Sequence, residues 1–371
     1  MNQQEMVNWL FENGGPAIRY RTATELMPPS GNINTGQLIE ELLQSQLVKT
    51  WLERFTPVRG INSLHSSKST AFENVVGKLT DLGCRHGMAE LDRQTRHFRQ
   101  WLQDNIERPP RNIHNGFARR LIAAFLARAG YTDDPVVGTV LKNRLETISD
   151  FTRQGSYDIY VDPADYERMP RSFQKKPLVN PALTRDGNSC LPSIYDIIGL
   201  AAYLPQHGTE DDQIRFNTII NYILNDRYQK LHPGYGILRT EDRRYYAMGW
   251  SVWLPGFFGE PSLDTRPGRS TPEMLGAFIQ RLVLMGEFPT TREHPWFINN
   301  LNHLEGFRTG NGTYQFPRAY LTEKPVGYWV AGARMALEEN RRKALAIELE
   351  STFWMAKLKA LLSTEGEMAV L

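Results

Sequence analysis

Residues 130–160 read GYTDDPVVGTVLKNRLETISDFTRQGSYDIY, and this stretch predicts how much of the chain folds. Asp134 can accept a hydrogen bond from a backbone N–H at a helix start, and Pro135 has no N–H to leave unpaired at the first helical position. Apolar residues then recur every three or four positions over 136–151, which is typical of a helix with one face in a core. Gly155 ends that helix, and a Gly-aromatic turn follows.

The same order of signals recurs along the chain. Comparable units start at Gly83, Gly130 and Gly286, and another Gly-aromatic turn contains Tyr235. The recurrence predicts an all-α protein made of repeated helical hairpins, including a buried helix over 193–203 and helical periodicity over 331–362. We expect residues 1–362 to form a single domain, with the Pro-rich stretch 158–192 as a long loop or lid and 363–371 as a frayed tail.

Composition narrows the class of protein. The 41% hydrophobic fraction is enough for a sizeable core, and the net charge of +2 argues against nucleic-acid binding, which requires a basic surface. Cys84 and Cys190 are far apart and form no metal-like pair, which favours a reducing compartment. The sequence shows neither a signal peptide nor an apolar run long enough to span a membrane. We therefore expect a cytoplasmic protein without a membrane span.

Three groups of motifs carry a resemblance to a known family. They are Trp9-Leu-Phe-Glu with the segment 18–26, the Asp134-Pro135 helix start, and His294-Pro295 with the segment 312–317. In these motifs the chain resembles the α/α toroids, bacterial proteins built like terpenoid cyclases and protein prenyltransferases. The resemblance implies concentric rings of helices around a cavity whose mouth is built by Gly-aromatic loops. The Asp-x-Asp-Asp run of the cyclases is absent, and the nearest string is the one at 210–212.

Four side chains are candidates for acid/base catalysis. Asp196 lies on an apolar helix, where burial would raise its pKa towards that of a general acid; alternatively, it caps a helix or pairs with an arginine. His65 lies in a polar loop with Glu73 eight residues on, and together with Asp81 they can form an acid/base pair; capping and surface hydrogen bonds explain them as well. Glu350 is similar to Asp196, or lies on a solvated face.

Aromatic residues are the candidates for ligand binding, because their faces stabilise cations and stack on sugars. The alternative is that they fill the core. The residues concerned are Tyr157, Tyr160, Tyr195, Tyr245, Tyr246, Trp250 and Trp253. Asp81, Cys84 and His86 are zinc-capable residue types, and the related prenyltransferases use such a set, but here the three are crowded at one helix end. We expect neither a metal nor a cofactor.

Three functions stay open at this point. The first is a cavity that binds a largely apolar, isoprenoid-like small molecule, with acid/base chemistry by Asp196. The second is a carbohydrate-active enzyme of the glycoside hydrolase or lyase type on the same toroid. The third is a non-catalytic binding or scaffold protein. An apolar lining with one acid favours the first, and two facing carboxylates with exposed aromatic residues favour the second. A filled centre favours the third.

Overall fold

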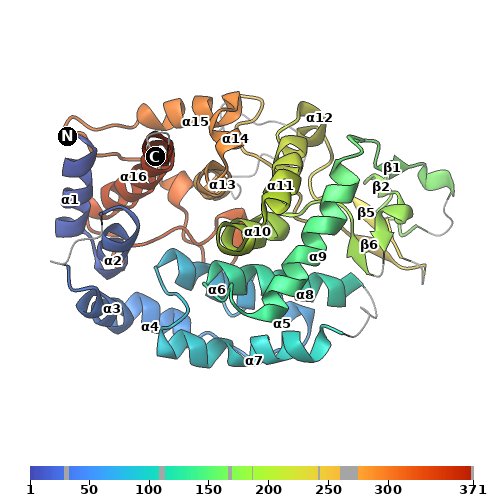
Figure 1. Ribbon diagram of the computed structural model, residues 1–371, viewed down its shortest axis with the longest axis horizontal. Helices are drawn as coiled ribbons and strands as arrows, with labels where there is room; N and C mark the ends of the chain where they lie inside the picture. The colour runs from blue at the N-terminus through green and yellow to red at the C-terminus, as the bar shows by residue number, and fades with distance from the viewer. Residues whose placement is uncertain are drawn as a thin grey trace. The chain divides into compact units, whose positions relative to one another are not determined.

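The computed structural model describes residues 1–28, 33–107, 113–165, 169–185, 187–240, 243–259 and 275–368. The chain forms two compact units: unit 1 is Met1–Thr95 with Pro255–Leu371, and unit 2 is Arg96–Leu254. The described residues are mostly helical, which confirms the helical class (Figure 1). Closure of residues 1–362 into a single toroid stays a prediction.

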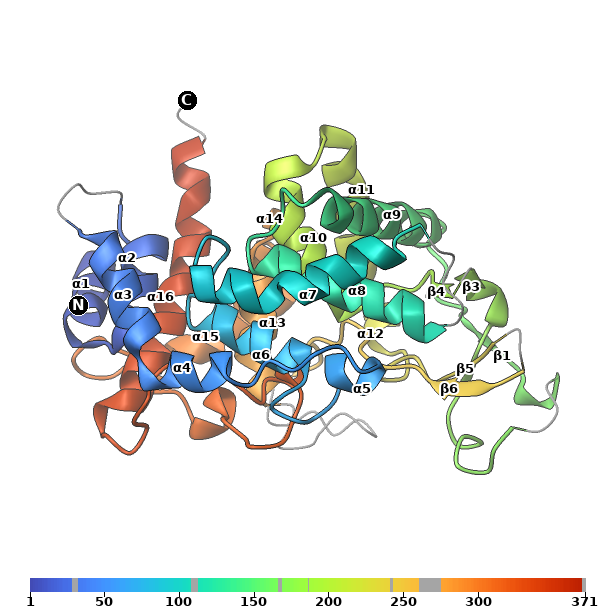
Figure 2. The same cartoon turned by 90° about the horizontal axis from the view of Figure 1, so that it is seen from below.

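Unit 1 holds most of its helices near the two ends of the chain. They are α1 (Gln3–Asn13), α2 (Pro16–Glu25), α3 (Thr35–Gln44), α4 (Gln46–Leu52), α5 (Ile61–Leu64), α6 (Phe72–Asp81), α13 (Gly276–Gly286), α14 (Pro289–Arg292), α15 (Pro295–Glu305), the 3₁₀ turns η4 (Arg318–Leu321) and η5 (Trp329–Ala331), and α16 (Leu345–Met368). α16 packs against α1, α2 and α13, so elements from both ends of the chain share one core (Figures 1 and 2). α16 also extends beyond Leu362, where a frayed tail is expected; residues 369–371 lie outside the described residues.

Unit 2 is built around helical hairpins. Its helices are α8 (Ile113–Arg128), α9 (Pro135–Thr152), α10 (Ile194–His207), α11 (Glu210–Ile223) and α12 (Asp226–Gln229), while α7 (Ala89–Asn105) contains the boundary between the units. α8 packs against α9 and α10, and α9 packs against α10 and α11 (Figure 2). The buried helix expected over 193–203 is α10, whose residues from Ile194 to Ala201 are all buried.

The start of α9 confirms the interpretation of its sequence. Asp134 is the N-cap, and its Oδ1 accepts a hydrogen bond of 3.0 Å from the backbone N–H of Val136. Pro135 occupies the first helical position. The helix ends at Thr152, and Gly155 has a φ of +63°, a region that non-glycine residues seldom adopt. Local signals alone are therefore enough to place this helix.

Two of the three proposed repeat starts have the same backbone structure. Gly83 and Gly130 follow α6 and α8 with φ values of +104° and +95°. After each glycine, the next N–H bonds back to the carbonyl five residues earlier, from Cys84 to Leu79 at 2.8 Å and from Tyr131 to Leu126 at 3.0 Å. This pair of features is the Schellman motif, which satisfies carbonyls that a helix end leaves unpaired. Gly286 differs, because it is the last residue of α13.

Two small sheets correct the expectation of an all-α chain. The first has the order β1 (Tyr160–Val161), β2 (Leu178–Val179), β5 (Ile237–Arg239) and β6 (Tyr245–Ala247); its β2–β5 pair is parallel and the other pairs are antiparallel. The second pairs β3 (Thr184–Arg185) with β4 (Asn188–Ser189). Four of these strands lie in the stretch 158–192, for which a loop is expected. Strands of two or three residues are too short to show an alternating pattern, so periodicity could not reveal them.

Candidate functional site

α6 is an unusual helix because all ten of its residues are buried although half of them are polar. A buried helix is normally apolar, since each buried polar group must find a hydrogen-bond partner. Half of this helix is polar or charged, namely Glu73, Asn74, Lys78, Thr80 and Asp81. The partners of these side chains therefore determine which parts of the chain gather around α6.

Asn74 joins two loops that are far apart in the sequence. Its Nδ2 donates to the carbonyls of Ser66 at 2.9 Å and Lys68 at 2.8 Å, in the loop after α5. Its Oδ1 accepts from the backbone N–H of Trp329 at 2.6 Å. One buried side chain thus fixes both loops by their backbones, which holds the neighbouring side chains in place.

His65 and Glu73, both predicted as site residues, meet in this region. Nδ1 of His65 lies 2.8 Å from Oε2 of Glu73. The Glu73 side chain is fully buried, whereas the His65 side chain is 18% exposed. The ring of Tyr328 lies beside the imidazole, with 4.8 Å between the ring centroids. Burial raises the pKa of Tyr328, and the nearby carboxylate of Glu73 raises it further.

This arrangement defines the His65 site: His65, Glu73 and Tyr328. A carboxylate accepts hydrogen bonds but does not donate them, so an ionised Glu73 keeps the proton of His65 on Nδ1 and fixes the plane of the ring. Proton exchange is then left to the other ring nitrogen. A carboxylate that orients a partly exposed imidazole also occurs in sites of general acid/base catalysis. Tyr328 was not predicted, because nothing in the sequence near it signals proximity to His65.

Asp81, the third member of the proposed acid/base group, lies at the other end of α6. Its Oδ2 accepts from Nε1 of Trp329 at 2.7 Å, and its carbonyl accepts from Arg21 at 2.6 Å. Cys84 follows and is fully buried, and burial raises the pKa of its thiol to about 12. Among the described residues no group of three His, Cys, Asp or Glu side chains is placed to hold a metal ion, and this includes Asp81, Cys84 and His86.

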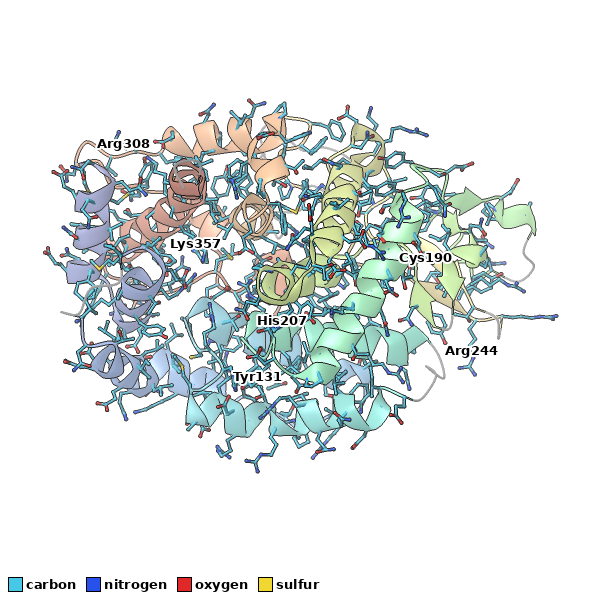
Figure 3. The ribbon with its side chains drawn as sticks, viewed as in Figure 1. Tyr131, Cys190, His207, Arg244, Arg308 and Lys357 are labelled. Atoms are coloured by element: carbon cyan, nitrogen blue, oxygen red, sulfur yellow. The ribbon has the colours of Figure 1, made fainter. Side chains whose placement is uncertain are left out.

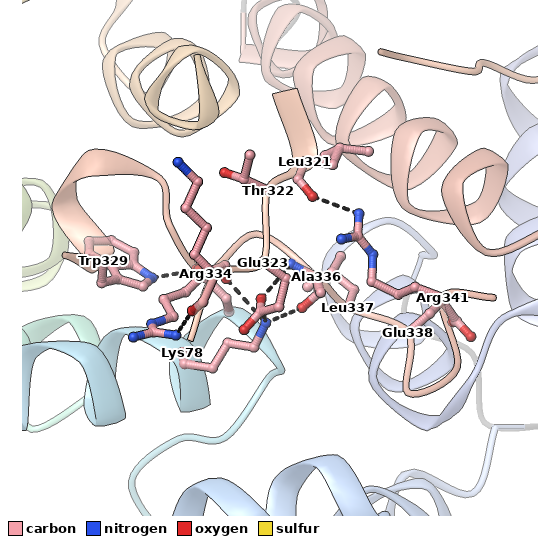
Figure 4. Close-up of polar contacts among 12 residues, drawn as sticks. Lys78, Leu321, Thr322, Glu323, Trp329, Arg334, Ala336, Leu337, Glu338 and Arg341 are labelled. Atoms are coloured by element: carbon pink, nitrogen blue, oxygen red, sulfur yellow. Dashed lines mark hydrogen bonds and ion pairs between the residues drawn. The ribbon is translucent and has the colours of Figure 1, made fainter. Parts of the chain in front are cut away.

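Lys78 fixes the loop that contains Tyr328 and Trp329 to α6 (Figure 4). Its ammonium is fully buried and pairs with Oε2 of Glu323 at 2.9 Å. It also donates to the carbonyls of Arg334, at 3.1 Å, and Ala336. Glu323 in turn accepts from the N–H of Ala336 at 3.1 Å. A buried charge with these partners is compensated, so the segment around Tyr328 is held on both sides.

Glu350, another predicted catalytic residue, is fully buried and holds a neighbouring turn. Its Oε1 accepts from the N–H groups of Leu337 and Glu338 at 2.9 and 3.0 Å, and its Oε2 accepts from Arg341 at 2.8 and 3.0 Å. Burial raises the pKa of Glu350, and Arg341 only partly offsets this. Arg341 continues to the carbonyl of Leu321 (Figure 4). These contacts give Glu350 a positioning role in unit 1.

Asp196 lies in unit 2 and takes the alternative role considered for it. It accepts from Arg144 at 2.8 and 3.2 Å and from the N–H and the hydroxyl of Ser193 at 2.9 and 2.7 Å. Asp196 is therefore an ion-pair partner, and it completes the capping box of α10, whose N-cap is Ser193. Burial acts to raise the pKa of Asp196, but Arg144 and Arg120 outweigh burial and lower it. The expected rise of this pKa is therefore wrong, because the sequence does not reveal the two arginines.

The aromatic candidates all belong to unit 2 and have varied surroundings. Tyr195 and Trp253 are buried, and Tyr195 packs against the rings of Phe117 and Phe125. The other five are half-buried, namely Tyr157, Tyr160, Tyr245, Tyr246 and Trp250.

Several of these half-buried rings have a structural contact. Tyr157 stacks on Tyr222 with 4.4 Å between centroids, and the hydroxyl of Tyr160 accepts from the N–H of His232. Trp250 has a φ of +70°, which is rare for a bulky residue and places strain at the start of the turn into Trp253. A role for the seven aromatic residues in ligand binding stays a prediction.

Comparison with known proteins finds no matching family model, no matching curated protein and no matching solved structure. The resemblance to terpenoid cyclases thus stays a prediction. None of the helices in the described part of the chain has the length and apolar character needed to cross a bilayer.

Proposed function

We propose that the protein is an enzyme that transfers protons on a polar substrate, with His65 as the group that exchanges the proton. The observation that carries this proposal is the 2.8 Å contact between Nδ1 of His65 and the fully buried carboxylate of Glu73. The imidazole is oriented before any substrate arrives, so little reorganisation is needed at the moment of proton transfer.

The loop that carries His65 favours a polar substrate. Residues 65–70 read HSSKST, and Lys68 is exposed, with an ammonium that pairs with none of the described residues. Such a loop offers hydroxyl groups and one positive charge, which suit a hydroxylated substrate with an acidic group. Of the three functions left open by the sequence, this supports the carbohydrate-active enzyme.

Within that class, the site favours a lyase over a hydrolase. Glycoside hydrolases generally use two carboxylates that flank the scissile bond, whereas the one carboxylate of the His65 site is held by the imidazole. In an elimination, His65 removes the carbon-bound proton next to a sugar carboxylate, a carbon–carbon double bond forms, and the C–O bond breaks. Tyr328 gives its proton to the departing oxygen. The substrate class we propose is therefore an acidic polysaccharide.

The apolar-ligand function has less support. It depended on Asp196 as a protonated acid, but two arginines hold the pKa of Asp196 below its ordinary value. A carboxylate that stays ionised is a poor proton donor. The cavity that this function requires belongs to the toroid, which stays a prediction.

The test is an elimination assay on the full chain. Polygalacturonate, alginate and hyaluronan are incubated with the protein, and the new double bond is followed by ultraviolet absorbance; nitrophenyl glycosides serve as hydrolase substrates. We expect His65→Gln to lower kcat by about 100- to 10,000-fold, the usual contribution of general acid/base catalysis. His303→Gln is the matched control, because His303 is a half-buried histidine of unit 1 that bonds a tyrosine hydroxyl, that of Tyr320, at 3.0 Å.

Two outcomes contradict the proposal. Elimination that persists in His65→Gln would show that another residue is the base. Absence of turnover on every substrate, with no rise in melting temperature, would favour the non-catalytic scaffold instead, since a ligand that binds only the native state raises its stability.

A further inference from the structure

An open surface cavity of about 250 Å³ lies on unit 2, where the first turns of α9 meet the last turns of α10. Its walls include Asp133, Gly138 and Lys142 on one side and Tyr203 and His207 on the other. This volume is smaller than the roughly 300–1,000 Å³ of sites for drug-sized ligands, so it suits a ligand with a single ring.

Tyr203 brings a hydroxyl to this cavity. The residue as a whole is 6% exposed, and its hydroxyl forms no hydrogen bond with any described residue. The oxygen is not among the buried polar atoms that lack a partner, so water in the open cavity can reach it. A ligand in the cavity that accepts a hydrogen bond from Tyr203 would replace that water.

Gly138 explains how the hydroxyl has room. A Cβ atom at this position would lie 2.8 Å from the hydroxyl oxygen of Tyr203. Gly138 lies in the first turn of α9. The space beside the hydroxyl therefore exists because residue 138 has no side chain.

His207 adds a second polar group next to the first. Its ring stacks on Tyr203 with 4.9 Å between centroids, as expected for residues four apart on one helix. Nε2 of His207 is buried and forms no hydrogen bond with the described residues; it lies 3.4 Å from Oδ1 of Asp133, a contact that is an ion pair only when the imidazole is protonated. Figure 3 labels His207 on its helix.

The ligand must complement both donors and acceptors. Tyr203 and Lys142 donate, the carboxylate of Asp133 accepts, and the stacked rings of Tyr203 and His207 present a flat surface. A simple anion would face the carboxylate of Asp133, and a simple cation would face the ammonium of Lys142 and accept no hydrogen bond from Tyr203. A ring with several hydroxyl groups satisfies all of these groups, because each hydroxyl both donates and accepts.

We propose that this cavity is a binding site for a single neutral sugar ring, with Tyr203, His207 and Asp133 as its polar contacts. The proposal does not depend on catalysis at the His65 site, which lies in unit 1. The ring lies against the stacked pair and accepts a hydrogen bond from Tyr203, while one of its hydroxyls donates to Asp133.

Saturation-transfer NMR on the full chain with D-glucose, D-galactose, D-mannose and myo-inositol tests the proposal. We expect at least one of these probes to bind, and Tyr203→Phe, which removes only the hydroxyl, to weaken that binding about five-fold, the effect of one hydrogen bond. Gly138→Ala fills the space beside the hydroxyl and should weaken binding further. Asn143→Ala is the control, because Asn143 is exposed and adjacent to Lys142 but does not line the cavity.

Two results would overturn the assignment. One is the absence of saturation transfer to all four probes at concentrations of tens of millimolar. The other is equal affinity in the wild type and Tyr203→Phe, which would place any bound sugar elsewhere. If Gly138→Ala does not fold, the comparison of Tyr203→Phe with Asn143→Ala still decides the outcome.

Discussion

Replacing Asp196 by Asn should strongly destabilise unit 2. The substitution keeps the size of the side chain but removes the charge that faces Arg144 and Arg120, whose side chains are 5% and 12% exposed. Removing one partner of a buried ion pair leaves the other charge uncompensated, at a cost of about 3–5 kcal/mol. The side-chain oxygen of Asn can still accept from the N–H of Ser193, the N-cap of α10, so this cost comes mainly from the ion pair.

The measurement is urea unfolding followed by helical circular dichroism. Because the chain has two units, the midpoint of the transition that reports unit 2 is compared rather than a single global free energy. Asp150→Asn is the matched control: Asp150 also pairs with an arginine, Arg153 at 3.3 Å, but both side chains are more than 60% exposed. An exposed pair contributes only about 0.2–1 kcal/mol. Equal effects of the two substitutions would refute the reasoning.

Acid provides a second test of the same ion pair. The pKa of Asp196 is lower in the folded protein than its ordinary value of about 3.9, so the unfolded chain binds the proton more readily. The charge of Asp196 therefore contributes fully to folding stability above the ordinary pKa of the unfolded chain. This contribution is lost as the pH falls through the lower pKa of the folded protein. We expect the wild type and Asp196→Asn to converge in stability as the pH is lowered below about 4. A difference that stays constant down to the acid transition would contradict this.

Two further predictions concern reactivity and backbone strain. Iodoacetamide should label Cys190, which is half-exposed, and leave Cys84 unmodified in the native protein, because burial and a pKa of about 12 keep the Cys84 thiol protonated. Peptide mass spectrometry measures the labelling of both cysteines. Rapid labelling of Cys84 in the native protein would contradict this prediction. Gly332→Ala should lower the melting temperature more than Gly155→Ala does. Both glycines have a positive φ, of 70° and 63°. A Cβ atom at Gly332 would meet the backbone of α13, whereas one at Gly155 would meet nothing within 4 Å. Equal losses would show that φ alone sets the cost.

Caps, prolines and glycines in the sequence correctly predicted where some helices begin and end. The cap and proline at Asp134 and Pro135 place α9, and the glycine at Gly130 ends α8, because these effects act within one turn of the chain. The segment 331–344 shows the opposite case. Its apolar periodicity predicted a helix, but α16 begins at Leu345, and bonds to Lys78 and Glu350 hold the preceding residues in an extended loop. Tertiary contacts override propensity there.

The same distinction applies to the candidate sites. His65 and Glu73 could be predicted as a pair because they are eight residues apart, on a loop and the helix that follows it. Tyr328 could not be predicted, since Asn74 and Trp329, which bring its loop to α6, are 255 positions apart. For Asp196 the sequence showed a lone acid on an apolar helix but not Arg144, 52 positions away, which decides the direction of its pKa.

The buried polar helix α6 has a consequence for biosynthesis. The ammonium of Lys78 and the Oδ1 atom of Asn74 find their partners 245–258 positions later in the chain, in the segment 323–336. A nascent chain that has emerged only as far as residue 300 therefore holds His65 and Glu73 but lacks the loop that fixes them. The ribosome must deliver most of the polypeptide before this helix can be enclosed, so we expect the site to mature late in translation.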